Sequence, residues 1–426
     1  MATEGVTSIL QAVAVARQRG DEAAARKLLD GALAKTPDDP MLLNARGMVA
    51  LAASEFSSAQ QFFGRAAKAD PAAPALLVNL ATACRGAGDD AGERQALQSA
   101  LELDRVNLTA NLRLAELHER LGEKGDALQH WTAVHGIAAA LPERTAQLDA
   151  LTRQAADQIA QHTAALAEIL EGGLSASREA VPLPDRRRFD ACLDVALGRR
   201  RIFHNECAGL HYPFLPEDEF FDRRHFPWMA ELEAKSDIIA AEFRELWRGA
   251  EGFSPYVTLK DGTPENKWSS LDKSLDWSAY FFWRHGERVE EAYARCPETG
   301  KIIDSLPICD IPGRSPSVFF SILRPHTRLP AHTGVTNVRA IVHLPLVIPP
   351  GCGFRVGGET REWKYGTAFA FDDTIDHEAW NDSDEPRAIL IFDVWNPHIQ
   401  PEERKLLQEF FRLTAATSYA TAATVD

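Results

Sequence analysis

A period of thirty-four residues organises the first third of the chain. Three sets of mostly small residues recur at that spacing: Gly20, Ser54, Gly88 and Gly122; Ala25, Ala59, Glu93 and Ala127; Ala32, Ala66, Ala100 and Val134. Paired helices need small side chains where they approach closely and a turn residue between them. Pro40 and Pro74 stand where the second helix of a pair is expected to stop. The spacing therefore predicts about four helix-turn-helix units across residues 7–142.

This pattern resembles the tetratricopeptide repeat, although the usual Trp and Tyr of that repeat are absent. The resemblance implies an all-α solenoid over residues 1–142 whose groove binds a peptide or a protein. The alternative is that the helices only dock on the rest of the chain. Residues 143–188 are expected to form one capping helix that ends at Gly172 and Gly173, followed by a Pro-rich, charged linker at 174–188.

Short strands dominate the later part of the chain. The runs VRAIVHLPLVI, FRVGG, GTAFAFDD and RAILIFDVW are rich in β-branched and apolar residues and are bounded by Gly, Pro, Asp or Asn. Such strands favour a sandwich or barrel over a βαβ sheet. The sequence thus predicts a multidomain protein. A jelly-roll or cupin-like domain with flanking helices follows the solenoid at residues 189–410, and a tail occupies 411–426.

Two histidines and an arginine within these strands suggest an iron site. His332 in PAHTGVTN and His377 in TIDHEAWN are forty-five positions apart, and Arg387 follows ten residues later. Neutral imidazole suits Fe(II), and a guanidinium grips the carboxylate of a 2-oxo acid in a planar, bidentate way. Such oxygenases usually add a carboxylate two residues after the first His, where this chain has Gly334. The candidates for a stand-in carboxylate are Asp372, Asp373 and Asp376.

The amino-acid sequence around these residues, from roughly Tyr212 to Pro401, resembles the aspartyl/asparaginyl β-hydroxylase family. The segments that carry the resemblance are HTGVTNVRAIVHLPLVIP, VGGETREWKYGTAFAFDDTIDHEAWND and RAILIFDVWNP. It implies a double-stranded β-helix in which His332 and His377 bind iron, water replaces the carboxylate, and Arg387 holds 2-oxoglutarate. The positions that match further cosubstrate contacts of the family are Trp277, Ser321 and His343.

One strand position departs from the family pattern. The family commonly has an Arg two residues before the His of its HL segment, and this chain has Ile341 there, with Arg339 two residues earlier. Because side chains alternate along a strand, Arg339 and Ile341 should face the same way. Arg339 is therefore a further candidate for the cosubstrate contact. The replacement of the family's Arg by Ile341 is expected to affect either the contact with the cosubstrate carboxylate or the substrate preference.

The resemblance implies an enzyme that uses Fe(II), 2-oxoglutarate and O₂ to hydroxylate an unactivated carbon. The expected target is the β-carbon of an Asp or Asn residue in a peptide or protein, with the repeat groove as a binding surface. Three alternatives remain: a hydroxylase of a small molecule or acyl chain, a non-catalytic interaction protein with a degenerate barrel, and a cupin-like metal isomerase. The isomerase alternative is weakened because such an enzyme would have no role for Arg387.

Charge and cysteine usage argue against several other classes. The formal net charge is −15, which disfavours a nucleic-acid or anionic-membrane partner. Six cysteines without a CxxC pair favour reduced thiols and argue against a zinc site. No run of about twenty apolar residues is present, and the N-terminus lacks the basic region of a signal peptide. We therefore expect a cytoplasmic protein without a membrane span.

Overall fold

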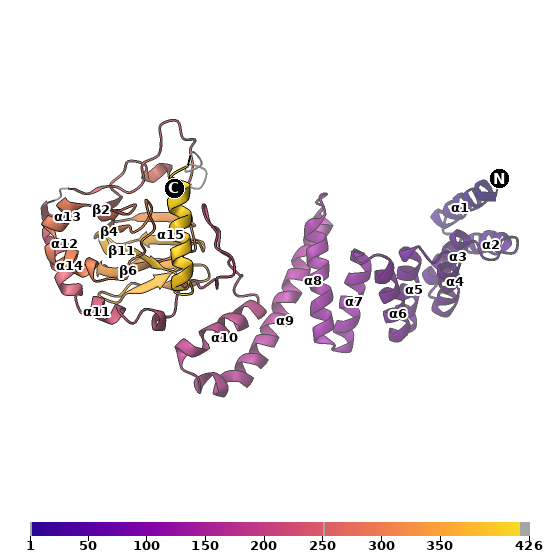
Figure 1. Ribbon diagram of the computed structural model, residues 1–426. Helices are drawn as coiled ribbons and strands as arrows, with labels where there is room; N and C mark the ends of the chain where they lie inside the picture. The colour runs from indigo at the N-terminus through magenta and orange to yellow at the C-terminus, as the bar shows by residue number, and fades with distance from the viewer. Residues whose placement is uncertain (1, 250–251, 418–426) are drawn as a thin grey trace. The chain divides into compact units, whose positions relative to one another are not determined.

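The computed structural model describes residues 2–249 and 252–417, which divide into two compact units after Ala180 (Figure 1). The first unit is helical, and the second contains all the strands of the described residues. The division falls inside the segment that was expected to hold a capping helix and linker. Residues 143–180 group with the helical unit, and residues 181–188 group with the second unit.

Helices of the first unit begin at intervals of thirty-four residues, as the sequence predicts. The first helices of three successive pairs are α3 (Pro40–Ala52), α5 (Pro74–Ala87) and α7 (Leu108–Leu121). Their partners are α4 (Phe56–Ala69), α6 (Asp90–Leu103) and α8 (Lys124–Ala140). An earlier pair is formed by α1 (Ala2–Gln18) and α2 (Glu22–Leu33). This is the arrangement of a tetratricopeptide-type solenoid.

The turn between the two helices of each pair requires a left-handed backbone. Gly20, Gly88 and Gly122 have φ angles of 75°, 71° and 72°, and Ser54 in the equivalent turn has a φ of 59°. Glycine adopts this region without a steric penalty, whereas a residue with a Cβ does not. The repeated glycine is therefore a backbone requirement, and Ser54 meets it at some energetic cost.

Close helix packing explains the other repeated small residues. Ala59 is fully buried, and a Cβ placed on Gly47 of α3 would collide with the ring of Phe63 on α4. Glu93 occupies the same repeat position as Ala59 and is also fully buried. Its carboxylate accepts a hydrogen bond from Arg120 Nη2 at 2.6 Å, which provides the partner that a buried charge needs.

Two boundary predictions in the first half of the chain were wrong. The helix α9 (Ala146–Glu179) continues through Gly172 and Gly173 and occupies much of the predicted linker. The Pro-rich segment after it starts α10 (Leu183–Ala196). Pro40 and Pro74 likewise begin α3 and α5 instead of ending the preceding helices. Proline is tolerated in the first turn because the N–H that it lacks has no partner within the helix there.

The second unit contains two antiparallel sheets that face each other, which confirms the double-stranded β-helix. The larger sheet has the order β1-β2-β4-β11-β6-β9, with β3 paired to β2, and the smaller has the order β5-β10-β7-β8. The strands of the larger sheet are β1 (Ser254–Pro255), β2 (Trp277–Arg284), β3 (Glu287–Arg288), β4 (Val318–Leu323), β6 (Arg339–Val347), β9 (Phe369–Phe371) and β11 (Arg387–Trp395). The strands of the smaller sheet are β5 (Thr327–His332), β7 (Cys352–Val356), β8 (Glu359–Arg361) and β10 (His377–Asn381).

Helices cover the outer face of the larger sheet, and Figure 1 shows them together on one side of the strands. They are α11 (Met229–Glu233), α12 (Ser236–Gly249), α13 (Glu290–Arg295) and α14 (Pro297–Asp304). Two short 3₁₀ turns, η1 (Arg223–His225) and η2 (Ser269–Leu271), lie in the connecting loops. The space between the two sheets holds a separate apolar cluster, and this inner space contains the candidate site.

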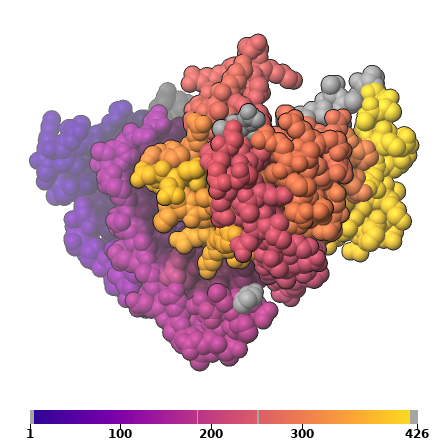
Figure 2. Space-filling model, turned by 90° about the vertical axis from the view of Figure 1, so that its left-hand side faces the viewer, coloured from indigo at the N-terminus to yellow at the C-terminus, as the bar shows by residue number. Residues whose placement is uncertain are grey.

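The last helix shows that the predicted domain end at residue 410 was too early. The helix α15 (Pro401–Ala415) lies on the outside of the second unit, in yellow in Figures 1 and 2. Phe411 is buried and packs in one apolar cluster with Trp395 and Ile311. Residues 411–415 therefore belong to the folded unit. The rest of the predicted tail, from residue 418, lies outside the described residues.

A β-bulge separates Trp277 and Trp283, which are six residues apart and would share one face of a regular strand. The register between β2 and β4 shifts between Phe281 and Trp283. As a result, Trp277 joins the apolar cluster between the sheets, and Trp283 packs against the cluster under the helices. A bulge inserts one residue and exchanges the faces beyond it.

All six cysteines are free thiols, four of them buried. Among the residues that the structure describes, no helix has both the length and the apolar character to cross a membrane.

Candidate active site

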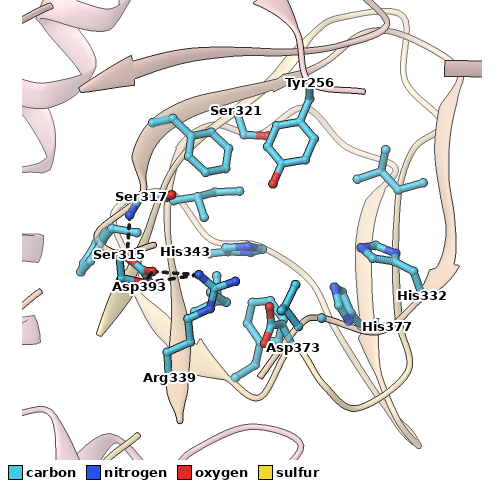
Figure 3. Close-up of a pocket in the computed structure, with 18 of the residues that line it drawn as sticks. Tyr256, Ser315, Ser317, Ser321, His332, Arg339, His343, Asp373, His377 and Asp393 are labelled. Atoms are coloured by element: carbon cyan, nitrogen blue, oxygen red, sulfur yellow. Dashed lines mark hydrogen bonds and ion pairs between the residues drawn. The ribbon is translucent and has the colours of Figure 1, made fainter. Parts of the chain in front are cut away.

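Strand pairing brings the two predicted histidines together. His332 is the last residue of β5, and His377 is the first residue of the neighbouring β10, directly opposite it in the antiparallel register. The centroids of the two imidazole rings lie 4.1 Å apart, with an angle of 49° between the ring planes. Figure 3 shows both rings on one wall of a cavity between the sheets. Forty-five residues of chain separate two groups that are in contact.

Backbone carbonyls leave one nitrogen of each imidazole available. His332 Nδ1 lies 2.7 Å from the carbonyl oxygen of Pro330, and His377 Nδ1 lies 3.0 Å from that of Ile375. A carbonyl oxygen only accepts hydrogen bonds, so each Nδ1 carries the hydrogen and each Nε2 keeps a lone pair. Burial lowers the pKa of His332 to about 4 and that of His377 well below its ordinary value. Both rings are therefore neutral at pH 7, as metal ligands must be.

Only one of the three candidate carboxylates reaches the cavity with the histidines. Asp372 accepts hydrogen bonds from Asn205 and Thr374, and Asp376 forms an ion pair with Arg355 at 2.9 Å. Neither side chain lines the cavity, whereas Asp373 does.

Asp373 also explains why residue 334 is a glycine. A side chain at Gly334 would collide with the Asp373 carboxylate, and the Gly334 amide donates a hydrogen bond to the Asp373 carbonyl oxygen at 2.6 Å. The Asp373 carboxylate thus takes up the space in which a side chain two residues after His332 would begin. Burial, opposed by the charge of Arg339, raises the pKa of Asp373 to about 7.

Arg387 is a buried cation with unpaired hydrogen-bond donors among the described residues. It is 1% exposed, and its Nε and Nη1 atoms have no hydrogen-bond partner among the described residues. The guanidinium carbon lies 4.7 Å from the ring centroid of Trp363, a residue that sequence analysis did not select. Burial lowers the pKa of Arg387 to about 10, so the side chain remains charged at pH 7. An unpaired buried cation is costly unless an anion accompanies it.

The other predicted cosubstrate residues surround the same part of the cavity. His343 is buried, its Nδ1 has no described partner, and burial together with the charge of Arg387 holds its pKa well below the ordinary value. The Trp277 indole donates a hydrogen bond to Ser321 Oγ at 3.1 Å. Tyr256, which sequence analysis missed, stacks on Trp277 with ring centroids 3.9 Å apart. All four line the cavity.

Arg339 lies farther along the strands, beside a carboxylate that sequence analysis did not identify. Arg339 and Ile341 both line the cavity, as strand alternation predicts. Arg339 Nη1 lies 3.1 Å from Asp393 Oδ2, and Asp393 is six positions beyond Arg387 on β11. That separation is about 20 Å along a strand, so Arg339 does not join the Arg387 group. The even spacing from Arg387 could have indicated that Asp393 faces the cavity.

A second group of potential metal ligands lies in the first unit. One ligand atom each from His118, Glu123 and Asp126 falls within 4.8 Å of the others. His118 Nδ1 is already 2.5 Å from Glu123, however, and Glu123 accepts hydrogen bonds from Arg94 at 2.8 and 2.9 Å. These contacts indicate a polar network between helices, separate from the histidine pair.

Fold and site together define a two-part protein: a helical solenoid followed by a double-stranded β-helix with two facing histidines and a buried arginine in one cavity of about 390 Å³. The family model for aspartyl/asparaginyl beta-hydroxylase matches residues 233–397. The chain belongs to this family, and the matched residues lie within its second unit.

Three relatives and neighbours indicate the extent of the similarity. The human aspartyl/asparaginyl beta-hydroxylase is 38% identical over 186 residues, which cover 42% of this chain and 24% of the human protein. The ornithine lipid ester-linked acyl 2-hydroxylase of Rhizobium tropici is 32% identical over 200 residues, which cover 46% of this chain and 67% of that protein. A crystal structure of MamA protein has a TM-score of 0.32 at 18% identity, covering 42% of this chain and 98% of MamA. The chain thus spans about a quarter of the human relative.

Proposed function

We propose that the second unit is an Fe(II)- and 2-oxoglutarate-dependent dioxygenase that hydroxylates the β-carbon of an Asp or Asn residue in a polypeptide. The observation that carries the proposal is the presence, in one cavity, of two neutral imidazoles and one buried guanidinium. The described residues provide no hydrogen-bond partner for the imidazole Nε2 atoms and no anion for the guanidinium. The imidazoles fit a divalent iron, and the guanidinium fits the carboxylate of a keto acid.

Each residue then has a defined task. His332 and His377 would hold the iron through Nε2, while the Pro330 and Ile375 carbonyls fix the orientation of the rings. Arg387 would bind the distal carboxylate of 2-oxoglutarate. Water would take the place of a third protein ligand, and Asp373 lines the same cavity.

When bound, iron with 2-oxoglutarate and O₂ supplies the oxidising power to replace a C–H bond by C–OH. The overall reaction converts substrate, 2-oxoglutarate and O₂ into hydroxylated substrate, succinate and CO₂. The chain contributes aromatic and aliphatic walls that exclude water, among them Trp268, whose ring centroid lies 4.8 Å from that of His332. Such walls protect a reactive centre from side reactions.

A polypeptide substrate is favoured by the solenoid, because stacked helix pairs present an extended surface for a peptide. A second candidate substrate is the acyl chain of a lipid. Two observations favour it: the similarity to the Rhizobium acyl 2-hydroxylase and the apolar walls of the cavity. The two candidates differ in the hydroxylated product, which mass spectrometry distinguishes.

The test is anaerobic Fe(II) titration of the full chain, followed by measurement of succinate formed from 2-oxoglutarate on exposure to O₂. His332→Ala and His377→Ala should abolish iron binding and succinate formation, and Arg387→Ala should mainly weaken 2-oxoglutarate binding. His204→Ala, at an exposed histidine outside the cavity, is the matched control and should behave like the parent. Iron binding that is indifferent to both cavity histidines would refute the proposal and favour a non-catalytic role.

A further inference from the structure

Beyond the histidines, the Arg339 guanidinium lies near two carboxyl groups of the cavity lining. The half-buried Arg314 also lines the cavity, and its guanidinium lies 5.0 Å from the ring centroid of Phe411. Arg339, Asp373 and Asp393 all line the cavity, and Figure 3 shows Arg339 between the other two side chains. They come from β6, from the loop before β10 and from β11. Their position between the histidine pair and the end of the larger sheet makes them candidates for contact with a substrate.

Asp393 has its hydrogen bonds satisfied within the protein. It accepts from Ser315 Oγ at 2.6 Å, from the Ser317 amide at 2.8 Å and from Arg339 Nη1 at 3.1 Å. The ion pair with Asp393 offsets the charge of Arg339. Arg339 is therefore not a free cation for a substrate carboxylate.

Two polar atoms near this ion pair remain without partners. Arg339 Nε and Asp373 Oδ1 are buried and have no hydrogen-bond partner among the described residues. One is a donor and the other an acceptor, and both belong to residues that line the same cavity beside the histidine pair. Buried polar atoms are rarely left without a partner. Arg339 Nε and Asp373 Oδ1 therefore indicate a ligand group that accepts one hydrogen bond and donates another.

Ile341 adds no cation to the part of the cavity around Arg339. It faces the cavity two residues from Arg339 on β6 and directly opposite Asp393 on β11, and it contributes no charge. A substrate carboxylate beside Arg339 would meet the carboxyl groups of Asp373 and Asp393 and a guanidinium that Asp393 already pairs. A carboxamide presents a C=O to Arg339 and an N–H to Asp373, and it carries no charge.

We propose that this cavity selects Asn over Asp as the residue to be hydroxylated, with Arg339 and Asp373 binding the side-chain carboxamide and Ile341 removing the cation that a carboxylate would need. The inference deepens the proposed function and rests on it. Like charges brought together in a site weaken binding strongly, so the preference should be about tenfold or more in kcat/KM.

The experiment uses the full chain with Fe(II), 2-oxoglutarate and O₂, and two degenerate peptide libraries that are identical except for a central Asn or Asp. Hydroxylated peptides are quantified by mass spectrometry, and succinate is measured in parallel. The parent should hydroxylate the Asn library at least about tenfold more efficiently. Ile341→Arg should shift the preference toward Asp, whereas Ile341→Leu, the matched control, should keep the parent preference.

Asp393→Asn provides a second variant in case an arginine at position 341 prevents folding. It removes one negative charge with little change in shape and should also favour the Asp library. Equal or better hydroxylation of Asp by the parent would overturn the inference, and so would succinate formation without hydroxylation of either library. If the parent forms no succinate and binds no iron, the proposed function itself fails and the inference falls with it.

Discussion

Replacing Arg387 by Met should stabilise the cosubstrate-free protein while weakening its binding of 2-oxoglutarate. Burial lowers the Arg387 pKa from 12.5 to about 10. A buried base whose folded pKa lies below its unfolded value opposes folding whenever it is protonated, and a drop of this size corresponds to about 3 kcal/mol at neutral pH. Methionine fills a similar volume against Trp363 but loses the cation–π contact. The expected net gain in unfolding free energy is therefore about 1–3 kcal/mol.

The effect on 2-oxoglutarate should have the opposite sign. Truncating one partner of a buried charged hydrogen bond costs about 2–5 kcal/mol, or roughly thirty- to several-thousand-fold in affinity. Ligand at a hundred times its Kd stabilises a protein by about 2.7 kcal/mol. If the Kd rises a hundredfold, the same concentration stabilises the variant by only about 0.4 kcal/mol.

Urea unfolding followed by tryptophan fluorescence, with and without 2-oxoglutarate, measures both effects. Eight of the nine tryptophans lie in the second unit, so the signal reports on the unit that contains Arg387. Arg355→Met is the matched control. Arg355 is paired with Asp376 and Glu378, so this substitution should lower the stability. The reasoning is refuted if Arg387→Met lowers stability without ligand and retains the full ligand-induced increase.

Three further predictions concern stability. Ser54→Gly should raise the unfolding free energy by about 1 kcal/mol and Gly88→Ala should lower it by a similar amount, because both residues have positive φ angles. Urea unfolding followed by circular dichroism, which reports on the helices, would detect either shift. Equal effects of the same sign would contradict this prediction. Arg120→Ala should lower the unfolding free energy by about 3 kcal/mol, because it leaves the buried Glu93 without its ion pair. Arg85→Ala breaks a more exposed pair with Glu116 and should lower the unfolding free energy by less than about 1 kcal/mol in the same assay. In metal-free protein, the stability that the parent has relative to Asp373→Asn should fall as the pH rises from about 4 to about 7, because the folded state keeps the Asp373 proton over this range and the unfolded chain does not. Urea unfolding across that range is the measurement, and a flat difference would count against a raised pKa.

Some features of the site could be predicted from residue types alone. His332, His377 and Arg387 stand out because few side chains suit iron and a keto acid, and the structure places all three in one cavity. The choice of Asp373 over Asp372 and Asp376 was not available from the sequence. The three carboxyl groups lie within five positions of one another, and only the path of the loop before β10 decides which of them enters the cavity.

By itself the sequence determined the local and periodic features of this protein. The thirty-four-residue spacing set where the repeat helices begin, because helix starts, turns and close packing depend on residues that are near one another in the chain. Tertiary structure alone decided the bulge that separates Trp277 from Trp283, the partnership of Arg339 with Asp393, and the unpaired atoms beside the histidines. These features depend on strand register and burial, which are set by contacts between distant segments and leave no fixed spacing in the sequence.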